Sequence, residues 1–286
     1  MKAILTDITK CIGCTECVSA CKEINDLPPD KPREWQKNDG LSARNWTSIL
    51  YNNENSVRKQ CRHCIEPACV SVCPVGALRK TDMGAVIYDD YKCLGCRYCM
   101  MACPYGIPRY DWDRTVPYIR KCILCYYKIQ DGTVNQPACT ETCPTKATIF
   151  GERDELIAEA KRRIKAEPDK YINHVYGEHE VGGTNVLYIT SKDCPLDFLF
   201  YYNNRVSKDV SLVGAPKPTD PLPETTKWAM GAVPIAFVGM GAIMAGTYAI
   251  MKRKEKIATE QTAASPPEQE EDIAPEDLSN EEEEKK

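Results

Sequence analysis

The cysteines of this chain limit what it can fold into more than any other feature. All of its 17 cysteines except Cys194 fall into four groups of four. The groups are Cys11, Cys14, Cys17 and Cys21; Cys61, Cys64, Cys69 and Cys73; Cys93, Cys96, Cys99 and Cys103; and Cys122, Cys125, Cys139 and Cys143. Thiolates are soft ligands that suit iron and zinc, so this clustering predicts bound metal.

The spacing within the groups separates the possible uses of cysteine. Disulfide scaffolds occur in short secreted chains, and neighbouring cysteines of a CxxC pair make strained disulfides. Structural zinc also uses CxxC pairs. Zinc does not explain the stretch "CLGCRYCMMACP" from Cys93 to Pro104, where a fourth cysteine and a proline follow CxxCxxC. That run is the bacterial ferredoxin signature for [4Fe-4S] clusters, in which three thiolates bind one cluster and the fourth binds a neighbouring one.

Four groups of four thiolates predict four [4Fe-4S] clusters with no ligand missing. The groups that start at Cys11 and Cys93 keep the spacing CxxCxxCxxxC, and those that start at Cys61 and Cys122 are stretched forms ending in CxxxCP. All the grouped cysteines are therefore predicted to bind a cofactor through its iron. A zinc-stapled interaction protein remains the alternative from another functional class.

The groups can be paired along the chain in two ways, as adjacent pairs or as an inner pair nested inside an outer pair. Only 19 residues separate Cys73 from Cys93, and this linker is predicted to form a short helix followed by a strand, which makes the two inner groups one ferredoxin module. The nested scheme predicts four ligand sets. They are Cys11, Cys14, Cys17 with Cys143; Cys21 with Cys122, Cys125, Cys139; Cys61, Cys64, Cys69 with Cys103; and Cys73 with Cys93, Cys96, Cys99.

Four stretches of the sequence carry a resemblance to a known family: "LSARNWTS" (41–48), "CRHCIEPACVSVCPVGAL" (61–78), "CRYCMMACPYGIPRYD" (96–111) and "VGGTNVLYIT" (181–190). With the nested cysteines, they resemble the iron-sulfur subunits of membrane-bound respiratory oxidoreductases. The nearest in appearance are the β subunit of respiratory formate dehydrogenases and the iron-sulfur protein of quinone-linked nickel-iron hydrogenase. The resemblance implies an electron relay without a substrate site of its own, and it agrees with the nested pairing.

The same resemblance implies the partners. They are a catalytic oxidoreductase subunit that holds molybdopterin or nickel-iron, and an integral membrane cytochrome or quinone subunit. Formate dehydrogenase is the preferred complex, and the hydrogenase or another molybdopterin oxidoreductase is the alternative. No serine, histidine and acid set and no paired-carboxylate motif indicates catalysis by this chain itself, and a net charge of −4 gives no support to nucleic-acid binding.

The predicted fold class is α+β, with two nested bacterial-ferredoxin-like [4Fe-4S] modules and a single C-terminal transmembrane helix. The four-cluster domain covers 1–150, with the inner module at about 61–110 and the outer module formed by 1–60 with 111–150. An amphipathic helix and a connector follow at 151–226, then the transmembrane helix at 227–252 and a disordered acidic tail at 253–286.

Two elements are expected after the last grouped cysteine. The stretch "ERDELIAEAKRRIKAE" (152–167) places Leu156, Ile157, Ala160 and Ile164 on one side, which predicts an amphipathic helix packed on the cluster domain. The stretch at 181–190 predicts a glycine turn that leads into a strand. From 195 to 226 the sequence is rich in proline and polar residues, which indicates an extended connector.

The segment "WAMGAVPIAFVGMGAIMAGTYAIM" (228–251) contains no charged residue, and it exceeds the about 20 residues needed to cross a bilayer. Its small residues suit close contact with another membrane helix. The basic run "KRKEK" (252–256) follows it, so the positive-inside bias puts the C-terminus in the cytoplasm and the cluster domain in the periplasm, with a cytoplasmic cluster domain as the alternative. We therefore expect a single-pass protein of the cell inner membrane, in contact with membrane lipid.

The N-terminal "MKAILTDITK" has neither an apolar signal core nor twin arginines, so we expect export as a passenger on a signal-bearing partner, which the formate dehydrogenase resemblance implies. Four basic residues beside the ligands are expected to raise cluster potentials or to pair with a partner: Lys92, Arg97, Arg120 and Lys121. His63 lies between two ligands and is expected at the surface or in support of them, because the clusters already have four thiolates each.

Overall fold

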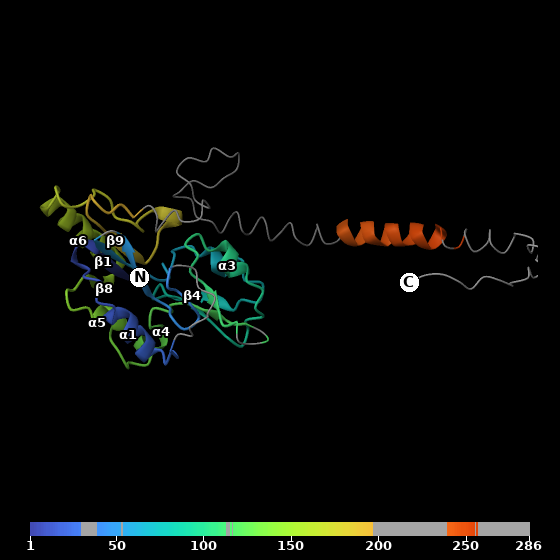
Figure 1. Ribbon diagram of the computed structural model, residues 1–286, viewed down its shortest axis with the longest axis horizontal. Coiled ribbons are helices and arrows are strands. Elements are labelled where there is room, and N and C mark those ends of the chain that lie inside the picture. The colour runs from blue at the N-terminus through green and yellow to red at the C-terminus, as the bar shows by residue number, and fades with distance from the viewer. Residues whose placement is uncertain are drawn as a thin grey trace, which may run out of the picture. The chain divides into compact units, whose positions relative to one another are not determined.

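The computed structural model describes residues 1–29, 39–52, 54–112, 115, 117–196, 239–254 and 256. The chain divides into two units, Met1–Gly231 and Ala232–Lys286. The described part of the first unit is a mixed helix and sheet fold, as predicted, and it contains all the cysteines. Figure 1 shows α1, α4 and α5 on the same side of this unit as the main sheet, with α3 and β4 on the other side.

The main sheet joins distant parts of the chain. It consists of β1 (Lys2–Asp7) between β8 (Thr148–Glu152) and β9 (Val186–Ile189), in the order β8-β1-β9 (Figure 1). The β1 strand pairs with β8 antiparallel and with β9 parallel. The predicted domain boundary at residue 150 therefore falls inside β8, and a strand from the following region joins the same sheet.

The helix α6 (Arg153–Ala166) covers one face of this sheet. Its Leu156, Ala160 and Ile164 are buried with the side chains of β1 and β9 that face them, so the predicted amphipathic helix is confirmed. The predicted strand after the glycine turn is also confirmed, since β9 is buried along its full length. Burial of apolar surface on both elements stabilises the sheet on which the N-terminus of the chain lies.

The remaining strands form three two-stranded antiparallel ladders. They are β2 (Ser48–Asn52) with β3 (Asn55–Lys59), β4 (Leu78–Lys80) with β5 (Val86–Tyr88), and β6 (Arg109–Tyr110) with β7 (Ile119–Arg120). Two 3-10 helices, η1 (Ile8–Lys10) and η2 (Glu180–Gly182), complete the described elements of this unit together with the short helices of the cysteine loops.

Five short helices lie in or beside the cysteine groups. They are α1 (Glu16–Ile24), α2 (Ala68–Ser71), α3 (Tyr98–Ala102), α4 (Tyr126–Gln130) and α5 (Ala138–Glu141). The helix α1 contacts α5, and α2 contacts α3. The first and last groups therefore lie side by side, as do the two middle groups.

The linker between Cys73 and Cys93 differs from its prediction. In place of a short helix it forms the β4–β5 hairpin, so that part of the prediction was wrong and only the following strand was right. Gly84 closes the turn at φ +100°, and the Thr81 hydroxyl accepts a hydrogen bond from the Ala85 N–H at 3.1 Å. A left-handed glycine at this place favours a turn over a helix, which the apolar periodicity of the linker did not reveal.

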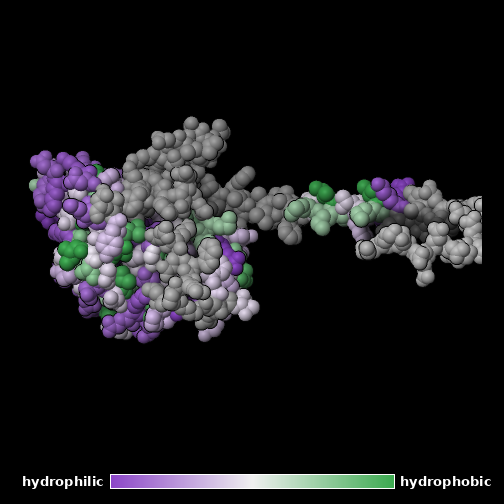
Figure 2. All heavy atoms as spheres, in the orientation of Figure 1, coloured by the Kyte–Doolittle hydropathy of each residue, from purple (hydrophilic) through white to green (hydrophobic). Residues whose placement is uncertain are grey.

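The second unit is described for residues 239–254 and 256, and residues 239–254 form a helix. Figure 2 shows mainly apolar colouring along this helix, with hydrophilic residues at its basic end. Within the described ranges, no helix has both the length and the hydropathy to cross a membrane. The first part of the predicted transmembrane segment (228–238), most of the predicted connector (197–226) and most of the predicted tail (255, 257–286) lie outside the described residues.

Candidate iron-sulfur sites

The thiols differ in exposure along the series of groups. Cys14 and Cys96 are exposed, and each belongs to a different predicted terminal site. The buried grouped cysteines are Cys21, Cys61, Cys99, Cys103, Cys122, Cys125 and Cys139. The middle of the series is thus shielded from water, while one thiol at each end reaches the surface.

The cysteine loops turn through left-handed backbone conformations at matching places. Thr15 follows Cys14 with φ 63°, and Arg97 follows Cys96 with φ 67°. Each of these residues precedes the short helix that carries the next ligands. Left-handed residues are uncommon outside glycine, and successive N–H groups around such turns form concave sites for anions. The repeated strain therefore indicates two loops shaped for the same kind of anionic group.

Neighbouring thiols identify the first predicted site. Burial raises the pKa of Cys11, and the charge of Cys143 adds to the shift although this residue lies far away in the sequence. Burial also raises the pKa of Cys17 to about 11, with Cys139, Cys11 and Cys14 as the neighbouring thiols. Cys11, Cys14, Cys17 and Cys143 line one cavity together.

The second predicted site is more deeply buried. Burial raises the pKa of Cys21, and the charges of Cys122, Cys139 and Cys125 add to this shift. These four thiols line a second cavity. The charge of Cys139 also adds to the raised pKa of Cys17, and the helices that carry these two thiols, α1 and α5, are in contact, so the first site lies beside the second.

In the two inner sites, too, the thiols that raise one another's pKa belong to the same predicted ligand set. Burial raises the pKa of Cys69, and the thiols that add to its shift are Cys103, Cys61 and Cys64. At the other inner site, burial raises the pKa of Cys99 to about 11, with Cys93, Cys96 and Cys73 as neighbours.

Cys61 and Cys122 connect the inner module to the outer one. The charge of Cys61 adds to the raised pKa of Cys122, whose largest cause is burial, and both thiols belong to the same buried core cluster. Within the inner module, Cys69 and Cys73 pack against one small core that also contains Cys99. The four groups of thiols therefore form a continuous series, with Cys14 at one end and Cys96 at the other.

A buried arginine provides a test of whether these residues fit an anionic cluster. Arg58 is 2 % exposed, and its Nη2 donates a hydrogen bond to the Thr148 hydroxyl at 3.2 Å. Its Nε and Nη1 have no hydrogen-bond partner among the described residues. Despite burial, the charges of Cys139 and Cys17 raise the pKa of Arg58. A buried cation is costly without an opposite charge, and clusters held by thiolates at these two sites supply one, so the residues fit.

Hydrogen bonds to sulfur add to this fit. The Ala77 N–H donates to Cys73 Sγ at 3.2 Å, and the Leu124 N–H donates to Cys122 Sγ at 3.4 Å. Among the described residues, no three His, Cys, Asp or Glu side chains converge to hold a single metal ion. The four thiolates of a cubane bind four different irons, so they stand further apart than the ligands of one ion.

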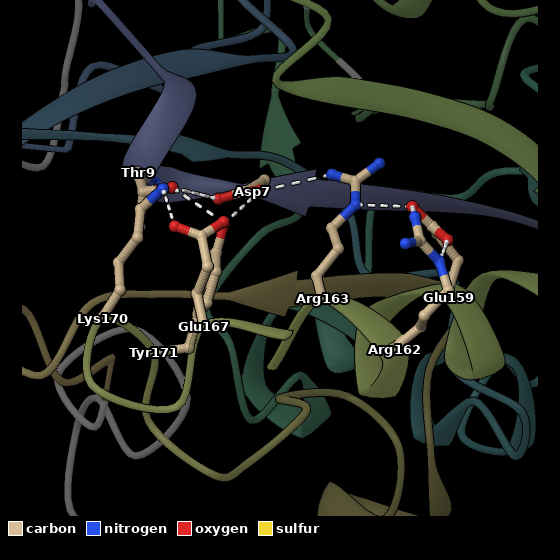
Figure 3. A network of polar contacts seen from close by, with 8 residues as sticks. All are labelled: Asp7, Thr9, Glu159, Arg162, Arg163, Glu167, Lys170 and Tyr171. Atoms are coloured by element: carbon tan, nitrogen blue, oxygen red, sulfur yellow. Dashed lines mark hydrogen bonds and ion pairs between the residues drawn. The ribbon is translucent and has the colours of Figure 1, made fainter. Parts of the chain in front are cut away.

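The polar network in Figure 3 fixes the start of the first cysteine loop. Asp7 ends β1 four residues before Cys11 and is fully buried. Its carboxylate accepts hydrogen bonds from the Tyr171 hydroxyl at 2.9 Å and from the Thr9 hydroxyl at 2.7 Å. It also pairs with Arg163 of α6 at 3.2 Å. The loop therefore starts next to Asp7, whose contacts join three segments of the chain.

The basic residues expected beside the ligands have different surroundings. Lys121 is 2 % exposed, and its ammonium bonds to the Val86 and Cys122 carbonyls. Arg120 instead forms an ion pair with Asp90 at 2.6 Å. Lys92 lies 3.7 Å from Asp89, and Arg97 lies over the Trp112 ring at 4.4 Å.

Two residues near the ligands add to the sequence-based expectation. His63 is fully buried, so of its two expected positions the surface is ruled out and a supporting position remains, and its Nδ1 accepts a hydrogen bond from the Val86 N–H at 2.9 Å. It therefore ties the loop of the Cys61 group to β5. Arg58 was missed altogether, because no local motif marks an arginine that meets Cys17 and Cys139 only in the folded chain.

Comparisons with known proteins agree with these features. A family profile described as a 4Fe-4S dicluster domain matches residues 54–153. The chain is 40% identical over 228 residues to the hydrogenase-2 operon protein HybA of Escherichia coli O157:H7, covering 65% of this chain and 69% of that protein. It is 39% identical over 159 residues to one subunit of the anaerobic dimethyl sulfoxide reductase of Escherichia coli K12, covering 52% of this chain and 73% of that subunit.

A third relative is the iron-sulfur subunit of the nitrate-inducible formate dehydrogenase of Escherichia coli K12, at 34% identity over 207 residues, covering 65% of this chain and 67% of that subunit. The thiol groups fit [4Fe-4S] clusters, and the similarity extends well beyond the cysteine motifs. The chain therefore belongs to the family of electron-transferring [4Fe-4S] iron-sulfur subunits of respiratory oxidoreductases.

Proposed function

We propose that this chain carries electrons through four [4Fe-4S] clusters between a catalytic subunit and a quinone- or haem-binding membrane subunit. The observation that carries the proposal is the continuous series of four thiol groups with an exposed cysteine at each end. Electron transfer needs closely spaced redox centres and access for a partner at both ends. The buried middle of the series keeps water away from the inner centres.

The proposed ligand sets are those of the nested scheme. The outer module holds one cluster with Cys11, Cys14, Cys17 and Cys143 and another with Cys21, Cys122, Cys125 and Cys139. The inner module holds one with Cys61, Cys64, Cys69 and Cys103 and another with Cys73, Cys93, Cys96 and Cys99. The neighbouring charges within each set support this assignment.

The residues of the chain position and tune the redox centres, which supply one-electron chemistry when bound. Arg58 and Lys121 are buried cations beside the thiol groups, and positive charge favours the more negative, reduced state. The Ala77 and Leu124 N–H groups donate hydrogen bonds to Cys73 Sγ and Cys122 Sγ, and hydrogen bonds to ligand sulfurs are one of the features that set the potential of a cluster. No step on this chain requires a proton to move.

Several catalytic partners fit the relay. The resemblance of the sequence makes a formate-dehydrogenase-type partner the preferred one, with a hydrogenase or another molybdopterin oxidoreductase as the alternative. The higher identity to the hydrogenase-2 operon protein, 40% against 34% for the formate dehydrogenase subunit, favours a hydrogenase-type partner. Purification of the intact complex from membranes distinguishes them. Formate reduces the clusters in the first case, and hydrogen reduces them in the second.

For the membrane, we propose a single span at 228–251 in the cell inner membrane, with the cluster domain in the periplasm and the C-terminus in the cytoplasm. The absence of charge in this segment and the basic run after it support the proposal. Protease added to inverted vesicles is expected to clip the acidic tail, and protease added to right-side-out vesicles is expected to leave it intact. The opposite result reverses the orientation.

Metal analysis tests the relay itself. Protein purified without oxygen is expected to contain about sixteen irons and sixteen acid-labile sulfides per chain, because each of four cubanes holds four of each. About eight irons would contradict the count of four clusters. Zinc in place of iron would overturn the proposal in favour of a zinc-stapled interaction protein.

A further inference from the structure

Tyr110 lies against a ligand sulfur at the exposed end of the inner module. Its hydroxyl oxygen is 3.0 Å from Cys99 Sγ, and both residues are buried, at 2 % and 5 % exposure. The distance is at the short end for a hydrogen bond to sulfur. Two other side-chain contacts to ligand sulfurs are longer: Asn25 to Cys21 at 3.7 Å and Thr145 to Cys143 at 3.8 Å.

The backbone holds the Tyr110 ring in place. Tyr110 lies in β6, and its Cα pairs with that of Ile119 in β7. Its ring packs against Trp112 at a centroid distance of 5.8 Å, and Trp112 is in turn covered by the Arg97 guanidinium. The hydroxyl is therefore preorganised toward Cys99 and needs no rearrangement when the charge on the sulfur changes.

The direction of the hydrogen bond follows from the chemistry of the ligand. A thiolate bound to iron has no proton to donate, so the tyrosine O–H is the donor and the sulfur is the acceptor. We propose that Tyr110 is a positioning residue that raises the reduction potential of the cluster held by Cys73, Cys93, Cys96 and Cys99. This inference rests on the proposed cluster assignment and deepens it.

The physical basis is the change in charge on reduction. One electron added to a cluster makes its sulfurs more negative, and a hydrogen bond to a more negative acceptor is stronger. The proton stays on the tyrosine oxygen, and no covalent bond forms or breaks. The donor therefore stabilises the reduced state more than the oxidised state. Because Cys96 of the same set is exposed, the tuned cluster is one at which electrons pass to or from a partner.

The test replaces only the hydroxyl. In the full-length chain purified without oxygen, Tyr110→Phe is expected to move one of the four midpoint potentials to a more negative value in a redox-poised EPR titration. The shift corresponds to about a three- to tenfold change in the equilibrium constant of one-electron reduction, the size of one hydrogen bond. Tyr98→Phe is the matched control, since Tyr98 is exposed and adjacent to the same ligand. It is expected to leave all four potentials unchanged.

A second substitution separates tuning from structure. Site-specific 3-fluorotyrosine at position 110 makes a stronger donor in the same place, so the same potential is expected to move to a less negative value. Identical potentials in the wild type and both Tyr110 variants overturn the inference and leave the relay intact. Wild-type protein without iron overturns the proposed function and this inference together. Loss of iron from Tyr110→Phe alone, with no shift in the fluorotyrosine protein, assigns Tyr110 a purely structural role and also overturns the inference.

Discussion

Arg58 has an environment that is hard to explain without a bound anion. It is buried, two of its guanidinium nitrogens have no hydrogen-bond partner among the described residues, and the neighbouring charges are the thiols of Cys17 and Cys139. These thiols belong to two different proposed clusters. One cation therefore acts on both clusters of the outer module.

Replacement of Arg58 by methionine keeps much of the side-chain volume and removes the charge. We expect two of the four midpoint potentials to become more negative, because each reduced cluster loses a nearby cation that contributes on the order of 1 to 3 kcal/mol. Arg58→Lys is expected to shift them less. Arg79→Met, which removes an exposed arginine of β4, is the control in the same EPR titration. A shift confined to a single cluster would contradict the shared role.

A substitution of Cys21 tests the nested scheme, because it changes a single thiol. It follows Cys17 by four residues, yet its neighbouring thiols are Cys122, Cys139 and Cys125. Cys21→Ser is therefore expected to alter the EPR signal of the cluster that Cys125→Ser also alters. It should leave the signal that depends on Cys11 unchanged. If Cys21→Ser and Cys11→Ser disturb the same signal, the nested scheme is wrong.

At the scale of elements, the contacts of Asp7 connect β1, α6 and the segment after α6 (Figure 3). Asp7→Asn removes the negative charge that pairs with Arg163. It also puts an amide in place of the carboxylate that accepts hydrogen bonds from Thr9 and Tyr171. We expect a loss of about 1 to 3 kcal/mol in the free energy of unfolding, because the amide leaves buried hydrogen-bonding groups imperfectly paired, although Arg163 keeps its second partner Glu159. Urea unfolding of the oxygen-free holoprotein, followed by circular dichroism, measures this loss.

Glu159→Gln is the matched control for Asp7→Asn. Glu159 pairs with Arg162 and with the same Arg163, at 2.7 Å in each case, but its side chain is 26% exposed, whereas that of Asp7 is fully buried. Ion pairs that water reaches contribute about 0 to 1 kcal/mol, so this variant is expected to unfold near the wild-type urea concentration. Equal losses in the two variants would mean that Asp7 has no special role as an anchor.

The elements that sequence reasoning predicted correctly are those with a local signal. The apolar positions Leu156, Ala160 and Ile164 repeat at helical spacing, so α6 was predictable within one residue at each end. The hairpin at β4–β5 was not, because its turn depends on the left-handed conformation of Gly84 in an otherwise helix-compatible stretch. The pairing of β1 with β9 has no local signal either, since it joins residues about 180 positions apart.

The same division holds for the site. Cysteine spacing predicts the ligand residues, because a loop around a cubane imposes short, fixed intervals. Arg58 and Tyr110 do not lie at any fixed sequence spacing from the ligand cysteines. They reach the sulfurs of Cys139 and Cys99 through the packing of separate ladders, so only the folded structure places them beside the ligands.

At the scale of the whole molecule, the grouped cysteines all lie before residue 144, and the proposed membrane segment lies after residue 227. Truncation before Trp228 is therefore expected to release the protein from the membrane with its iron content unchanged. Reduction of an artificial acceptor by the catalytic subunit should survive, and reduction of quinone should fail. Iron analysis, membrane fractionation and the two activity assays measure these outcomes. A truncated chain that stays on the membrane would show that another contact holds it there.

The sheet order β8-β1-β9 also has a consequence for biosynthesis. A chain leaves the ribosome from its N-terminus, so β1 emerges long before the two strands that flank it exist. The four thiols from Cys11 to Cys21 share their proposed ligand sets with cysteines beyond residue 120, which are synthesised much later. The two inner groups are separated only by a short hairpin. Closing a short loop costs less entropy than closing a long one. The inner pair is thus the part of the chain that can load its iron first, and the N-terminal thiols remain open to oxidation until synthesis has passed Cys143, the last of their proposed partners.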